Sequence, residues 1–288
     1  MAGELVTTTS TMAGYMERAQ ARLSASFLIK SRLFGTPGWW QPAVNANIVQ
    51  FPKIPAPTPV SEHSTEADTA SATAISTAAA TATMKIWHQE TTVTKKAILG
   101  GSEMDRPTMA QLLNNVASGV DKHIASIATE ASFTSTPVPN VVTFGAFQEA
   151  VTTLRNTGYE GEMFAWMSEY MLSEIMSDLR TAVLPQVNED FINSGYRGRL
   201  MNIPIYTLPS SWLPTSTTNG KVNGLLGFKD FSVGIGYHGG DGGEGQGLMH
   251  LFSEEKALHY VLSATAYVSA VALSATGGIL IESDSATK

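Results

Sequence analysis

Residues 108–131 read TMAQLLNNVASGVDKHIASIATEA and carry the strongest structural signal in the chain. Their large apolar side chains recur every three or four residues, which places them on one face of an α-helix. Thr108 and Gln111 match a capping box, so we expect a helix of about 24 residues, ~36 Å long, ending near Ala131. The side chains expected to pack on this face are Met109, Leu112, Leu113, Val116, Val120, Ile124 and Ile127.

A stripe of this length needs a continuous apolar surface beneath it. The richest candidate strands lie late in the chain, at residues 261–273 and 279–281, helped by residues 93–99. We therefore expect residues 95–135 and 258–282 to form one folding unit.

The stretch between these two parts alternates helical and strand-like segments, which indicates an α+β class. Helices are expected at residues 144–157 and 168–179, the second capped by Ser168 with Glu169 in its first turn. Strands are expected at residues 161–166, 200–207, 224–236 and 247–252.

Upstream of the helix the chain has an unusual extended character. A strand-like run at residues 47–56 is interrupted and followed by prolines. Residues 69–83 are almost entirely Ala, Ser and Thr, and Ile75 is the one large side chain among them. Such a segment buries too little apolar area to form its own core, so it is either a disordered linker or part of a protruding hairpin. Strand-like alternation resumes at Met84, which places Lys85 and Trp87 together on the face opposite Met84. This pattern favours a hairpin lying on a neighbouring subunit.

The N-terminal region combines helical spacing at residues 12–34 with a Gly/Pro stop at residues 35–38. Trp39 and Trp40 follow directly. Adjacent residues of an extended chain project to opposite sides, so at least one of these indoles needs a partner surface, either the protein's own core or a neighbour.

Composition narrows the class of protein. The chain has 288 residues, of which 43% are hydrophobic and 15% charged, below the ~25% typical of soluble domains. A weakly charged surface suggests that partners cover much of it, although a Thr/Ser/Ala-rich monomer has the same composition. The net charge of −7 and the lack of a Lys/Arg block argue against a dedicated nucleic-acid-binding module.

Several kinds of chemistry are excluded or disfavoured by residue type. The chain has no cysteine, which removes disulfides, thiolate zinc sites and cysteine nucleophiles. Residues 1–10 lack the pattern of a signal peptide, and the apolar stretch 257–281 reads as buried strands rather than a membrane span. The six histidines are not paired at metal-ligand spacing.

Two short motifs resemble catalytic or nucleotide-binding signatures. Gly234, Gly236 and Gly239 have dinucleotide-fingerprint spacing, but more glycines follow instead of a helix, so we expect a mobile exposed loop at residues 239–247. Ser253 and Lys256 form a Ser-x-x-Lys match in a charged stretch that reads as a solvated turn. We therefore expect no catalytic residue, no metal site and no cofactor.

The order of these segments resembles that of a known family. Four segments carry the resemblance. They are residues 51–55 with Glu62 and Glu66, residues 95–104 leading into the long helix, residues 164–168, and residues 198–205, in which Asn202 stands where glycine is usual. Together they resemble the major capsid proteins of tailed double-stranded DNA phages, whose Hong-Kong-ninety-seven-type fold is shared with encapsulins.

The resemblance implies an N-terminal arm at residues 1–44, an extended loop at 45–94, a peripheral domain with a spine helix at 95–139 and 256–288, and an axial domain at 140–255. It implies self-assembly into pentamers and hexamers of an icosahedral head that encloses DNA without sequence-specific binding. Portal, scaffolding and decoration proteins are the further partners implied, with assembly in the bacterial cytoplasm, a final location in the virion and no membrane. The inter-subunit contact candidates are Trp39, Trp40, Glu62, Glu66, Ile75, Lys85 and Trp87.

Two other functions remain open from sequence. One is an encapsulin-type shell that holds a cargo enzyme, which neighbouring genes would distinguish from a phage head. The other is a cysteine-free hydrolase whose site is assembled from distant residues. A concave pocket with coupled titratable groups in a monomer would favour the hydrolase.

Overall fold

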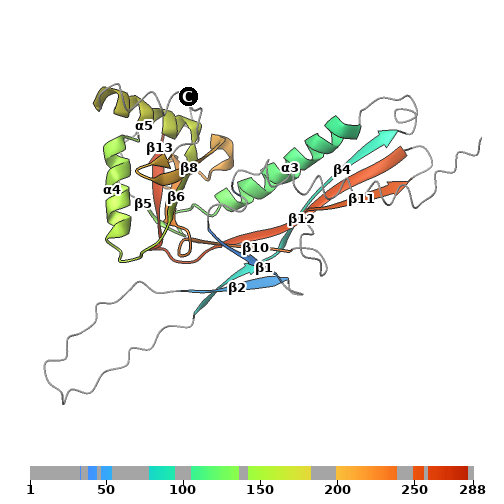
Figure 1. Ribbon diagram of the computed structural model, residues 1–288, viewed down its shortest axis with the longest axis horizontal. Helices are drawn as coiled ribbons and strands as arrows, with labels where there is room; N and C mark the ends of the chain where they lie inside the picture. The colour runs from blue at the N-terminus through green and yellow to red at the C-terminus, as the bar shows by residue number, and fades with distance from the viewer. Residues whose placement is uncertain are drawn as a thin grey trace, which may run out of the picture.

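The computed structural model of the chain describes residues 33, 38–43, 47–53, 78–94, 105–135, 142–182, 199–238, 249–255 and 259–284. These residues form two larger sheets, a two-stranded hairpin and three α-helices (Figure 1). Several expectations lie outside the described residues: most of the N-terminal helix at 12–34, Glu62, Glu66, Ile75, the strand at 95–104 and the glycine loop at 239–247.

A six-stranded sheet, here called the axial sheet, occupies one end of the molecule. Its strand order is β5 (Thr134–Ser135), β13 (Gly278–Ser283), β9 (Val222–Phe228), β6 (Met163–Ser168), β8 (Ile203–Leu208) and β7 (Arg199–Leu200). Every residue of β6, β9 and β13 is buried, including the polar residues Ser168, Asn223 and Glu282, as expected of strands covered on both faces. Helix α4 (Phe144–Arg155) packs on β13 and β9, and α5 (Glu169–Ala182) packs on β6 and β8. A short 3₁₀ turn, η2 (Ser210–Trp212), follows β8.

A five-stranded sheet, here called the spine sheet, extends away from that end (Figure 1). Its longest strand, β12 (His259–Ala272), pairs antiparallel with β4 (Lys85–Thr94), β11 (Met249–Glu255) and β10 (Val233–Tyr237). Strand β1 (Trp39–Pro42) lies parallel to β10. Helix α3 (Asp105–Ala125) packs across β12 and β4. This helix is the long one expected from the apolar stripe.

The ends of α3 differ from those expected. The helix begins at Asp105, so Thr108 lies inside its first turn and the predicted capping box is wrong. Pro107 is tolerated there because the first turn has no intrahelical partner for its backbone nitrogen. At the other end the chain leaves the helix after Ala125, and Asn223 Nδ2 donates to the Ala128 carbonyl at 3.4 Å. Ala131, expected on the apolar stripe, is exposed.

The assignment of strands to sheets also differs from the expected division of the chain. Strand β13 belongs to the axial sheet, whereas β10 and β11 belong to the spine sheet. The chain crosses between the sheets after α3, after β9 and after β12, and the last two crossings lie together. Phe228 N donates to Gly277 O at 3.0 Å, and Leu273 N donates to Ser232 O at 2.9 Å. The expected boundary at residue 255 therefore does not separate the two sheets.

Strand β11 also corrects an expectation. Residues 253–255 were expected in a solvated turn, but they continue β11 opposite β12, with Glu254 paired to Val261 and Glu255 to Tyr260. Lys256, the second residue of the Ser-x-x-Lys match, lies outside the described residues.

The hairpin of β2 (Ile48–Pro52) and β3 (Ala79–Thr83) is antiparallel, with Pro52 opposite Ala79. One face is buried in a small separate core with Leu273, and the other face is exposed. The last residues of the small-residue segment are therefore at the base of the hairpin and not at its tip. Their size explains the placement, because Ala80 and Ala82 leave room for Phe51 and Val49 in this core.

Two glycines of β10 bring this hairpin close to the spine sheet. A Cβ at Gly234 would lie 2.9 Å from Cγ of Phe51, and one at Gly236 would lie 2.9 Å from Cγ2 of Val49. These distances are shorter than normal van der Waals contacts. Gly234 and Gly236 are thus packing residues inside a strand, which accounts for their Gly-x-Gly spacing without a nucleotide.

The two axial helices are joined through the start of α4. Asp178 of α5 accepts a hydrogen bond from Phe144 N at 2.8 Å, and Glu174 accepts one from Val142 N at 3.1 Å. These carboxylates satisfy backbone donors that a helix leaves free at its N-terminus. At the start of α5, Ser168 Oγ accepts from Met171 N at 3.1 Å, which confirms the predicted cap. None of the helices in the described ranges is long and apolar enough to cross a membrane.

Candidate subunit-contact surfaces and pockets

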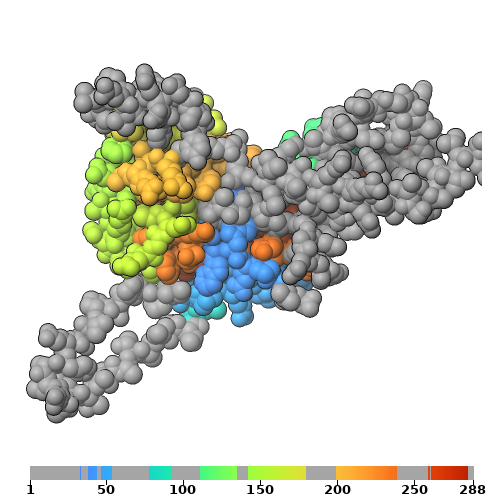
Figure 2. All heavy atoms as spheres, in the orientation of Figure 1, coloured from blue at the N-terminus to red at the C-terminus, as the bar shows by residue number. Residues whose placement is uncertain are grey.

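Trp39 and Trp40 both find partners within the chain. The Trp39 ring lies 5.9 Å from the Phe51 ring in an edge-on arrangement, and Trp40 lies 6.1 Å from Tyr237. Both indoles are half-buried. Figure 2 shows their segment, in blue with β2, at the middle of the visible face. Ordinary packing therefore accounts for much of each surface, and the remaining area is available for a contact with a neighbour.

Lys85 and Trp87 lie at the start of β4 in different surroundings. Lys85 is exposed. Trp87 packs under α3, where Gly119 leaves room for it: a Cβ at Gly119 would lie 3.2 Å from the indole ring. The indole Nε1 donates to the Val268 carbonyl at 3.2 Å. Trp87 thus joins α3, β4 and β12.

His123, four residues after Gly119 on α3, also lies close to that indole. The two ring centroids are 5.2 Å apart, and His123 Nε2 is buried with no hydrogen-bond partner among the described residues. Burial, reinforced by the nearby charge of Lys85, lowers the pKa of His123 from 6.5 to about 4. The folded subunit therefore favours the neutral imidazole.

This shift predicts an acid-sensitive packing of α3 on β4. The unfolded chain takes up the proton near pH 6.5 and the folded chain near 4, so stability is full above about 6.5 and falls as the pH drops between them. The loss between pH 7 and pH 5 should reach at most about 2 kcal/mol. Urea unfolding at the two pH values should show it in the wild type and show a smaller loss in His123→Phe, which keeps an aromatic ring beside Trp87. Equal losses in both proteins would contradict the assignment.

Exposed apolar side chains lie in β2 of the hairpin and at the start of β4. Ile48 of β2 is 50% exposed and Ile86 of β4 is 65% exposed. Ile48 pairs with Thr83, the last residue of β3, and β4 begins two residues later at Lys85. Solvent contact with side chains of this size is unfavourable, so Ile48 and Ile86 mark a candidate contact surface. Tyr170 of α5 is the third large exposed apolar residue in the described part of the chain, at 52%.

A histidine on β4 has hydrogen-bond partners of the kinds found in a hydrolase triad, but the hydroxyl group among them is not accessible to a substrate. His88 Nδ1 lies 2.8 Å from Thr265 Oγ1, and Nε2 lies 3.1 Å from Glu90 Oε1. A hydroxyl, an imidazole and a carboxylate in that order can activate a nucleophile. Thr265 is only 5% exposed, however, and a nucleophile must reach its substrate. The network is better explained as a polar tie between β4 and β12.

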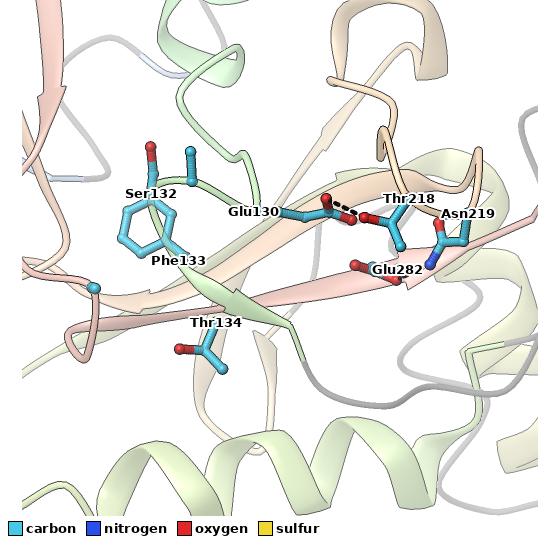
Figure 3. A pocket seen from close by; sticks show the side chains of 9 residues that line it. Glu130, Ser132, Phe133, Thr134, Thr218, Asn219 and Glu282 are labelled. Atoms are coloured by element: carbon cyan, nitrogen blue, oxygen red, sulfur yellow. Dashed lines mark hydrogen bonds between the residues drawn. The ribbon is translucent and has the colours of Figure 1, made fainter.

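Figure 3 shows a pocket of about 480 Å³ between the loop after α3, the turn before β9 and strand β13. Glu130 on its wall accepts hydrogen bonds from Ser216 and from Thr218, the latter at 2.9 Å, and these hydroxyls lower the Glu130 pKa. Glu282 is 5% exposed and accepts from Asn219 Nδ2 at 2.8 Å. Both carboxylates thus tie the turn to its surroundings. Among the described residues, no three His, Asp or Glu side chains are placed to hold a metal ion.

A second pocket, of about 450 Å³, lies between the end of α4 and the β7–β8 hairpin. Arg155 and Arg199 line it, together with Glu162. Its apolar lining is Met163, Met201, Ile203 and Pro204. We call it the arginine pocket. Its lining residues are far apart in sequence, so no short sequence motif could have predicted this pocket.

The β7–β8 turn shapes one wall of this pocket. Met201 and Asn202 both have positive φ angles, of 53° and 67°. Two consecutive left-handed residues give the tight two-residue turn that suits a twisted hairpin. Asn202 adopts the left-handed conformation expected of a residue in a glycine position, and its side chain accepts a hydrogen bond from Arg199 at 3.3 Å. The turn thus holds Arg199 beside the pocket.

The spine-helix residues are placed as follows. Leu112, Leu113, Val116, Val120 and Ile124 are buried in the main core, and Ile127 packs against it from the turn after the helix. Met109 lies within α3, where its side chain is outside the description.

Comparison by sequence finds no matching family model and no matching curated protein. Comparison of structures finds extensive similarity. The capsid of the cyanophage P-SCSP1u is 14% identical, with a TM-score of 0.58 over 85% of this chain and 86% of its own. The capsid of a native GTA particle is 10% identical, with a TM-score of 0.62 over 88% and 90%. An encapsulin complex from Synechococcus elongatus PCC 7942 is 13% identical, with a TM-score of 0.56 over 87% and 86%.

Proposed function

We propose, from the Hong-Kong-ninety-seven-type capsid fold that this chain has, that it is the major capsid protein of a tailed double-stranded DNA phage. Its function is structural: copies of the chain associate into pentamers and hexamers, which close into an icosahedral head around DNA.

One observation carries this proposal. The similarity to shell-forming proteins covers 85–88% of this chain and 86–90% of theirs. It therefore extends over almost the whole architecture and is not limited to one domain inserted in a different protein. At 10–14% identity, the feature held in common is the arrangement of elements and not a set of side chains.

The surface supports a structural role. Large apolar side chains remain exposed in β2, at the start of β4 and on α5, where a neighbouring subunit would cover them. The chain carries a net charge of −7, which suits a wall that encloses DNA without gripping it. Portal, scaffolding and decoration proteins would be further partners, with assembly in the host cytoplasm and a final place in the virion.

An encapsulin-type compartment is the second candidate. The Synechococcus encapsulin aligns with a TM-score of 0.56, close to the 0.58 of the cyanophage capsid, so fold similarity alone separates them little. Particle contents distinguish the two functions. A phage head would hold nuclease-protected double-stranded DNA, and an encapsulin would hold a folded enzyme.

The test of the shell function is the assembly state of the wild-type chain. Expressed in bacteria and purified, it should elute as capsomers or larger particles, and negative-stain microscopy should show closed shells. A shell is built from many copies of the chain, so particle yield should rise with protein concentration. A monodisperse monomer at every concentration and salt tested would contradict the proposed function.

A further inference from the structure

The arginine pocket holds two positive charges that the described residues leave without a carboxylate partner. Neither Arg155 nor Arg199 forms an ion pair with a carboxylate in the described part of the chain. The pocket's own carboxylate, Glu162, is 84% exposed and lies 3.7 Å from Lys229 Nζ. Two guanidinium groups beside one hollow favour a ligand with negative charge, because each can bind a carboxylate through two parallel hydrogen bonds.

The floor of the pocket adds a second requirement. Met163 and Ile203 are buried beneath it, and Met201 and Pro204 are partly exposed. A free phosphate or a DNA backbone would satisfy the arginines but leave Met201 and Pro204 in contact with water. A peptide with carboxylates next to large apolar side chains satisfies both parts of the pocket.

The chain contains one such segment near this pocket in sequence. Residues 188–192 read NEDFI, which places Glu189 and Asp190 directly before Phe191 and Ile192. This segment belongs to residues 183–198, between α5 and β7, outside the described ranges. Its two acidic residues match the two arginines, and its two apolar residues match the two partly exposed apolar side chains of the pocket, Met201 and Pro204.

We propose that the arginine pocket of one subunit binds residues 189–192 of a second copy in the same ring. This proposal rests on the proposed shell function. A cyclic ring is built from a heterologous contact, so each subunit must present two different surfaces that complement each other. The pocket and the segment are such a pair, and both come from the part of the chain around the axial sheet. Charge pairing of this type sets which faces meet and speeds their encounter.

Charge reversal on each side tests the contact. Arg155→Glu/Arg199→Glu makes the pocket acidic, and Glu189→Lys/Asp190→Lys makes the segment basic. Either double variant should keep the wild-type circular dichroism spectrum and melting temperature, and should form rings with about tenfold lower yield or less. Lys122→Glu, an exposed cation on α3, is the control and should assemble normally. Mass photometry counts the rings.

Mixing the two double variants separates a contact between copies from one within a chain. In the mixture every acidic pocket can meet a basic segment on the next subunit, so six-membered rings of alternating variants should form. Five-membered rings cannot alternate, so closed shells should stay rare. One chain carrying all four substitutions should restore both rings and shells.

Two results would overturn the proposal. Normal assembly of Arg155→Glu/Arg199→Glu would show that the pocket is not a contact. Rescue by the fourfold variant without rescue by the mixture would show that the segment binds its own chain. Failure of the shell function would look different, because the wild-type chain would then form no rings, and the proposed contact would fall with it.

Discussion

Ile124→Asp is expected to give insoluble or unfolded subunits, and not folded subunits that fail to assemble. Ile124 is 0% exposed and lies in the main core, on the helix that packs across β12 and β4. The substitution would place a carboxylate where no described cation or donor is arranged to receive it. Burial of an unpaired charge costs several kcal/mol, against a total stability of about 5–15 kcal/mol for a typical domain.

A matched control lies on the same helix. Asn115 is exposed, so Asn115→Asp introduces the same side chain without burial and should fold normally. Soluble yield, circular dichroism and urea unfolding distinguish the two variants, and Leu112→Asp should behave like Ile124→Asp because Leu112 is 3% exposed. Soluble, folded Ile124→Asp protein that loses assembly alone would mean that this face of α3 meets a neighbour instead of the spine sheet.

The helix that this experiment addresses could be predicted because periodicity encodes which face is buried. The spacing of Leu112, Val116, Val120 and Ile124 specifies one face of a helix whatever lies beneath it. Its ends were less predictable. Thr108 and Gln111 have the residue types of a capping box, but the helix starts at Asp105 and ends at Ala125.

The strand partners could not be predicted for a related reason. Strands such as β13 and β10 are buried on both faces, so their hydrophobic pattern does not indicate which sheet they join. The crossings after β9 and β12 depend on contacts such as Phe228 N to Gly277 O, which no local pattern contains. Fold class and element order survive these errors, because they depend on element type and not on pairing.

The contact surfaces show the same limit. Trp87 was singled out by residue type alone, and its packing against Gly119 and His123 became visible only when α3 and β4 were placed. Arg155 and Arg199 sit in ordinary polar stretches of sequence. A two-residue turn and the end of a helix bring them to one pocket.

Replacement of residues 54–77 by Asn-Gly is expected to leave the subunit folded and to abolish shell formation. The two ends of this connection are already adjacent, because Lys53 N donates to Ala78 O at 2.9 Å and Pro52 lies opposite Ala79. Asn-Gly is the preferred two-residue turn for closing such a pair of strands. The buried residues of the hairpin base, Phe51 among them, are unchanged. Melting temperature should therefore stay within a few degrees of the wild type.

The expected loss of assembly follows from what the replacement removes. Residues 54–77 contain Glu62, Glu66 and Ile75, three of the proposed contacts with neighbours, and in sequence they connect β2, where Ile48 is exposed, to β3. In a second variant, a Gly/Ser linker of equal length replaces residues 54–77. This variant distinguishes the effect of the segment's length from the effect of its side chains. If specific contacts matter, this variant should also fail to form shells, because a flexible chain regains length but not the contacts. Electron microscopy and sedimentation measure the outcome. Normal shells from the Asn-Gly variant would show that the connection does not hold neighbouring subunits together, and the cohesion of the shell would then have to come from the axial and spine sheets alone.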